Sequence, residues 1–141
     1  MMFDGYKHKV PVQLRFSDID RLNHVNNALY HTYIELGRVH YLNEVLNRSV
    51  DWEQRGFILA HMEVDHLTPI FLTDEVFCFT KVSKVGTKSI TLKNAVTKLV
   101  HSEWVLCADA SSVLVAMDYQ DNVTIPLPPE WRRLISSFDN I

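Results

Sequence analysis

Between Asp18 and Ala28 the sequence concentrates polar side chains that can do chemistry. The segment holds the carboxylates of Asp18 and Asp20, the imidazole of His24 and three asparagines. A strand-like run ends at Phe16 and a helix-like run starts near Ala28. The segment therefore brings these groups to a helix start, where N–H groups lack internal acceptors. A general acid or base beside free hydrogen-bond donors fits a catalytic loop. A turn with an asparagine cap is the alternative.

The elements that must position this loop predict an α+β fold. Val10–Phe16 alternates apolar and polar residues, which is typical of a half-buried strand with Phe16 on the apolar side. Helical spacing predicts one long helix over Asn27–Asn47, in which Gly37 indicates a close packing contact. Later runs predict four strands and a short C-terminal helix: Ile58–Ile70, Asp74–Val85, Ser89–Val100, Glu103–Met117 and Glu130–Phe138.

The length of the last two strands predicts a strongly curved or bulged sheet. We expect one domain, residues 1–141, in which a curved antiparallel meander wraps around the long helix. One long helix and a single sheet leave a face or an edge uncovered, so we also expect a homo-oligomer.

Composition narrows the function classes. The net charge is −3, and no basic stripe invites nucleic acid or an anionic membrane. The first residues lack the apolar region of a signal peptide, and no apolar run approaches the ~20 residues of a membrane span, so we predict a cytoplasmic protein. Cys78 and Cys107 lie in apolar runs and are predicted to be buried thiols. Neither belongs to a metal-binding motif, so no metal site is predicted.

Three blocks of sequence carry longer motifs. The first runs RFSDIDRLNHVNNALYHTYIELGR from Arg15, the second is DHLTPI from Asp65 followed by DEV from Asp74, and the third is VGTKS from Val85. Together they resemble the hotdog-fold thioesterases of the 4-hydroxybenzoyl-CoA thioesterase-like superfamily, whose pattern D-x-D-x-x-G-H-V-N-N-x-x-Y-x-x-Y-x-E-x-x-R is similar to the first block. Asn23 stands where that pattern has glycine, and asparagine tolerates a positive φ better than other non-glycine residues.

The resemblance implies a curved sheet around a central helix, a dimer or tetramer with sites shared between subunits, and hydrolysis of an acyl-CoA. Asp20 matches the catalytic aspartate and can act as a nucleophile or as a general base. Asn27 matches the position whose backbone N–H polarises the thioester carbonyl. Glu35 matches a helix carboxylate that is catalytic in a sister branch, although a pair with Arg38 explains it more simply.

The remaining candidates have weaker signals. His24 can donate to the carbonyl or orient the aspartate, or it can be structural. Asn26 can contact substrate or cap the helix. His61 and His66 have opposite strand parity, and either can line the acyl pocket. Lys84 and Lys88 flank Gly86, where they can meet coenzyme A phosphates or remain solvated.

The sequence therefore predicts an acyl-CoA thioesterase that needs no cofactor beyond the coenzyme A of its substrate. A non-catalytic acyl-thioester sensor and an acyl-carrier-protein thioesterase are the alternatives. A hydratase is disfavoured, because such relatives carry a histidine in a glycine-rich motif and this chain has only 4 glycines.

Overall fold

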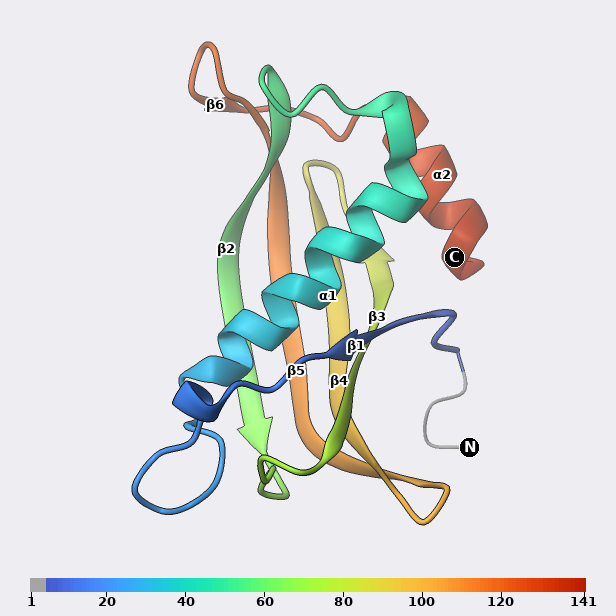
Figure 1. Cartoon of the computed structure of the whole chain (residues 1–141). Coiled ribbons are helices and arrows are strands. Elements are labelled where there is room, and N and C mark those ends of the chain that lie inside the picture. Colours follow the sequence, from blue (N-terminus) through green and yellow to red (C-terminus); the bar gives the residue numbers. More distant parts are fainter. Residues whose placement is uncertain (1–4) are drawn as a thin grey trace.

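The computed structural model describes residues 5–141 and shows one long helix lying across one face of an antiparallel sheet (Figure 1). The described elements, in chain order, are β1 (His8–Val12), a 3₁₀ helix (Phe16–Asp18), α1 (Leu29–Leu46), a second 3₁₀ helix (Asn47–Ser49), β2 (Arg55–His66), β3 (Glu75–Val85), β4 (Ser89–Val100), β5 (Glu103–Asp118), β6 (Val123–Thr124) and α2 (Pro129–Asp139). This arrangement is the hotdog fold, so the predicted fold class is confirmed.

The strand order within residues 5–141 is β1-β3-β4-β5-β2, with the short β6 added to β5. Only β3, β4 and β5 form the predicted meander. The expectation that all four strands after the helix follow in order is wrong, because β2 pairs with β5 and leaves β1 beside β3. Register shifts in all three long pairings (β2–β5, β3–β4 and β4–β5) confirm the predicted bulges and bend the sheet around α1.

The first strand is shorter than predicted. β1 ends at Val12, and the Phe16 side chain is 84% exposed rather than buried. The Arg15 N–H donates to the Asp18 carboxylate at 3.2 Å, and the Asp18 N–H donates to the Arg15 carbonyl at 2.9 Å. These bonds turn the chain into a 3₁₀ helix before the strand can continue.

Gly37 is a point where α1 approaches the sheet closely. A methyl group at this position would lie 2.6 Å from the Cys78 sulfur and 2.8 Å from the Thr80 hydroxyl of β3. The predicted close contact at Gly37 is thereby confirmed. Cys78 and Cys107 are free and buried, and burial raises their thiol pKa values to about 12 and about 11.

The apolar core continues along α1 on both sides of Gly37. Toward the helix C-terminus, Tyr41 and Leu46 pack with Trp131 and Ile135 of α2. Toward the helix start, the core holds Val25 from the polar loop, Tyr33 and Ile34 of α1, and side chains of the sheet and the β2–β3 connection, among them Val12, Val96 and Ile70. The loop between β1 and α1 is therefore anchored in the core through Val25.

Candidate active site

A tight reversal gives the predicted catalytic loop its shape. Ile19 and Val25 form an isolated antiparallel bridge, and the Asp20 N–H donates to the His24 carbonyl at 3.1 Å. The Asn23 N–H closes the turn on the Asp20 carbonyl at 3.0 Å, with Asn23 at φ 68°. Asparagine accordingly adopts the left-handed conformation that the family pattern assigns to glycine.

Asp18 is the internal anchor of the loop. Its residue exposure is 1%, and its carboxylate accepts the Tyr33 hydroxyl at 2.7 Å and a guanidinium N–H of Arg15 at 3.2 Å. Its carbonyl also accepts the Asn26 N–H at 3.0 Å. Burial, followed by the bond to Asp18, raises the pKa of Tyr33 well above its usual range. These partners occupy both oxygens of the Asp18 carboxylate and tie it to Arg15 and to α1.

Asp20 lies at the turn itself and is half-buried. One carboxylate oxygen accepts the Leu22 N–H at 2.9 Å, and the other has no hydrogen-bond partner among residues 5–141. The bond between the Asp20 N–H and the His24 carbonyl puts Asp20 in the same turn as a residue of the pocket described below, although Asp20 is not itself one of its lining residues.

Just before α1, the Asn27 amide has no acceptor among residues 5–141. The Ala28 N–H donates to the Asn26 side-chain oxygen at 2.9 Å, and the Leu29 and Tyr30 N–H groups donate to the carbonyls of Asn26 and Asn27. Asn26 thus contributes a local cap. In the described part of the chain, the Asn27 N–H has no acceptor, and the residue is exposed. A donor of this kind at a helix start is suited to bind a developing negative charge.

A pocket of about 280 Å³ opens beside this amide. Its lining residues are His24, Asn27, Tyr30, His66, Leu67, Thr68 and Pro69. The His66 ring packs edge-on against Tyr30 with centroids 4.7 Å apart, and burial raises the pKa of Tyr30 to about 12. The Val25 N–H donates to the Ile70 carbonyl at 2.8 Å, which joins the loop to the opposite wall. The predicted His24 and Asn27 therefore share a pocket with His66 and Tyr30.

Glu35 and Arg38 lie further along α1. Glu35 is exposed and does not line the pocket at Asn27. Arg38 is half-buried and lines a second cavity of about 350 Å³ with Leu42, Trp52 and Phe57. Burial lowers the pKa of Arg38, while the Glu35 carboxylate acts in the opposite direction. No ion pair or hydrogen bond joins Glu35 and Arg38 among residues 5–141, so their pairing stays a prediction.

The structure does not bring His61, Lys84 or Lys88 to the pocket. His61 is exposed on β2, with its imidazole 3.8 Å from the Glu63 carboxylate. Lys84 and Lys88 lie at the β3–β4 turn, at the opposite end of the sheet from the polar loop (Figure 1). The β5 residues paired with His66 and Ser89 are Ala108 and Val115, seven positions and hence about 23 Å apart.

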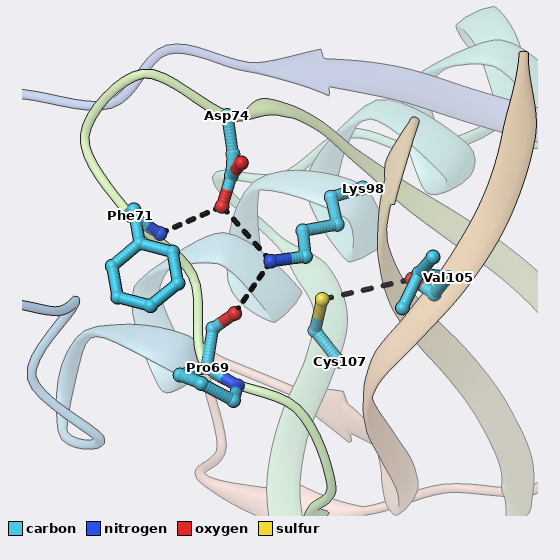
Figure 2. Close-up of polar contacts among 6 residues, drawn as sticks. All are labelled: Pro69, Phe71, Asp74, Lys98, Val105 and Cys107. Carbon is cyan, nitrogen blue, oxygen red and sulfur yellow. Dashed lines mark hydrogen bonds and ion pairs between the residues drawn. The ribbon is translucent and has the colours of Figure 1, made fainter. Parts of the chain in front are cut away.

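Lys98 is a functional candidate that the sequence motifs do not single out, whereas its partner Asp74 begins the DEV part of the second motif block. Lys98 is 8% exposed on β4, and its ammonium donates to the Pro69 carbonyl at 2.9 Å and to Asp74 at 3.1 Å (Figure 2). The alternation of β4 could have identified Lys98 from the sequence, because Lys98 lies on the same face of the strand as the apolar Ile90, Leu92 and Val96. A lysine on a buried face must have a partner.

The site lies entirely within a match to a known family. A model of the thioesterase-like superfamily matches residues 14–135. The chain belongs to the thioesterase-like superfamily. The crystal structure of a thioesterase from Thermus thermophilus, complexed with coenzyme A and Zn, is 33% identical to this superfamily member. It has a TM-score of 0.83 and covers 98% of each chain.

Other relatives are less similar or match over a shorter range. The DHNA-CoA thioesterase of Staphylococcus aureus has a TM-score of 0.81 at 17% identity, covering 94% of this chain and 90% of that one, and shows the shared fold alone. YsmA, an uncharacterised protein of Bacillus subtilis strain 168, is 32% identical over 81 residues. That match covers 57% of this chain and 54% of YsmA, which is about half of the length of YsmA. None of the helices in residues 5–141 has the length and apolar character of a membrane span.

Proposed function

We propose that this member of the thioesterase-like superfamily hydrolyses acyl-CoA thioesters to a free acid and coenzyme A. The observation that carries the proposal is that the Asn27 N–H has no acceptor among the described residues, while Asn27 is one of the residues that line a pocket at the start of α1. The 33% identical Thermus thermophilus thioesterase was crystallised with coenzyme A, which supports this substrate class.

In the proposed mechanism the Asn27 N–H donates to the thioester oxygen. Negative charge develops on that oxygen as the carbonyl carbon becomes tetrahedral, and a fixed amide stabilises it without reorganisation. Asp20 supplies the carboxylate that activates water or attacks the carbonyl carbon itself. When Asp20 activates water, it takes a proton from that water and passes the proton to the coenzyme A sulfur as the C–S bond breaks. When Asp20 attacks the carbon itself, the C–S bond breaks to leave an acyl–Asp20 anhydride and a coenzyme A thiolate; water then hydrolyses the anhydride, which releases the acid, frees the carboxylate and supplies the proton for the thiolate. The free oxygen of Asp20 and its bond to His24 support this role.

His24, Tyr30 and His66 surround the space next to that amide and are the side chains we assign to the acyl group. Asn26 holds the Ala28 amide and thereby shapes the helix start. Neither carboxylate is among the lining residues, but Asp20 belongs to the same turn as the lining residue His24, whereas Glu35 lies eight residues beyond Asn27 on α1. Asp20 rather than Glu35 is therefore the proposed catalytic carboxylate.

Thiol release measured with an aromatic disulfide reagent tests the proposal. The panel comprises acyl-CoAs of increasing chain length, aryl-CoAs and acyl-carrier-protein thioesters. We expect wild-type turnover of at least one acyl-CoA, and Asp20→Asn should lose at least ~10² in kcat. The carboxamide still accepts the Leu22 N–H, so the turn is retained.

Glu35→Gln is the matched control, because it also replaces one carboxylate by its amide and should keep wild-type kcat. An active Asp20→Asn with an inactive Glu35→Gln would reverse the choice of carboxylate. Saturable binding of a non-hydrolysable acyl-CoA without thiol release from any thioester would identify a sensor.

A further inference from the structure

The β2–β3 connection, residues 67–74, forms the wall of the pocket opposite Asn27 and is bonded at both ends. At the β2 end, the N–H groups of Leu67 and Thr68 donate to the Cys107 carbonyl at 2.8 and 3.2 Å. Cys107 is the extra residue of a β5 bulge, since Val96 pairs with Ala108 and Thr97 with Leu106. The bulge leaves the Cys107 carbonyl outside the β4–β5 ladder and available to the wall.

Lys98 holds the middle of the same connection. Its ammonium donates to the carbonyl of Pro69, which lines the pocket, and to the Asp74 carboxylate. The same Asp74 oxygen accepts the Phe71 N–H at 2.7 Å, and the ammonium lies 5.1 Å from the centre of the Phe71 ring (Figure 2). The buried ammonium of Lys98 therefore contacts three residues of the wall, namely Pro69, Phe71 and Asp74.

The bonds continue from Lys98 to the catalytic loop. Pro69 is followed by Ile70, whose side chain is fully buried and whose carbonyl accepts the Val25 N–H at 2.8 Å. Val25 lies between His24 and Asn26 in the loop. A displacement of Pro69 is thus passed through one residue to the segment that carries the Asn27 amide.

We propose that Lys98, together with Asp74, is a positioning residue that sets the distance between the pocket wall and the Asn27 amide. The proposal rests on the proposed thioesterase function. Lys98 does not line the pocket, so it acts on the substrate through Pro69 and Val25. Because binding geometry controls the approach of reacting atoms, a small shift of the wall lowers kcat more than it alters substrate affinity.

The test compares Lys98→Met with Lys93→Met. Methionine keeps an unbranched side chain of similar length but donates no hydrogen bond. Lys93 is five positions earlier on β4 and thus on the opposite face, where it lies with Glu63, Asp65 and Asp109. We expect Lys98→Met to lose at least about tenfold in kcat with KM within about twofold of wild type. Lys93→Met should have the kcat and the KM of the wild type.

Amide hydrogen exchange separates positioning from a general loss of stability. In Lys98→Met the Val25 amide should exchange at least about tenfold faster, while amides in the centre of β4 keep their wild-type rates. If Lys98→Met does not fold, Asp74→Asn is measured in its place, because it removes the ion pair but keeps an acceptor for Phe71. Equal kcat in the Lys98 and Lys93 variants, or equal acceleration of all amides, would overturn the proposal.

The proposed thioesterase function and the positioning role of Lys98 can be contradicted independently of each other. A wild-type protein that releases no thiol from any acyl-CoA contradicts the proposed function. The exchange rates of Val25 then still decide whether Lys98 positions the loop.

Discussion

Replacing Asn27 by proline removes the backbone donor that the proposed mechanism requires, together with the carboxamide side chain. The Asn27 N–H has no acceptor among the described residues, so its loss breaks no internal hydrogen bond. By contrast, the Asn26 N–H donates to the Asp18 carbonyl and the Ala28 N–H to the Asn26 side chain, so proline at either position would cost about 1 kcal/mol for the lost bond. Proline is also tolerated at helix starts.

We therefore expect Asn27→Pro to fold and to lose ~10²–10³ in kcat, equivalent to about 2.7–4 kcal/mol of transition-state stabilisation. Asn27→Ala is the matched control, because it shortens the side chain but keeps the amide, and its kcat should stay within about threefold of wild type. Thiol release under saturating acyl-CoA gives kcat, and thermal unfolding checks that both variants are folded. A folded Asn27→Pro with wild-type kcat would refute the assignment of this amide.

Three further predictions concern stability and assembly. Gly37→Ala should destabilise the fold by about 1–2 kcal/mol in urea unfolding, since overpacking against Cys78 exceeds the gain in helix propensity, and a second change, Cys78→Ala, should recover part of the loss. Burial lowers the pKa of His8 despite the Glu44 carboxylate at 3.2 Å, so the unfolded chain binds the extra proton and stability falls as pH drops below about 6.5. His8→Gln should make the urea midpoint of unfolding depend less on pH between pH 5 and 8. If the midpoint keeps its wild-type dependence on pH, other groups are responsible for that dependence. Light scattering at micromolar concentration should give at least twice the 16.4 kDa chain mass, because the β2 edge is exposed, whereas a monomer mass would contradict the oligomer.

Local chemistry explains what could be predicted from the sequence. Asn23 indicated a left-handed turn and Gly37 a close approach, because each residue type tolerates a geometry that others do not. The helix and the long strands followed from apolar periodicity, which depends only on neighbouring residues. The early end of β1 was missed because the Asp18 carboxylate competes with the strand for the Arg15 amide, an interaction that alternation does not reveal.

The features that could not be predicted depend on pairing between segments that are far apart in the sequence. Alternation shows which face of β2 is apolar but not which strand lies beside it, so the pairing with β5 could not be predicted. That pairing brings His66 and the following wall residues to the helix start, about forty residues away in sequence. The ion pair of Lys98 with Asp74 likewise joins β4 to the β2–β3 connection across 24 positions.

The close contact at Gly37 also gives α1 a fixed point about which the helix can tilt. Gly37 lies ten residues from Asn27, which corresponds to about 15 Å along the helix axis. A tilt of about 4° around this pivot would swing the free amide by about 1 Å, a displacement that can cost ~10² in rate. Substitutions in the sheet beneath Gly37, remote from the pocket, can therefore retune catalysis by changing the inclination of the helix while leaving every pocket residue in place.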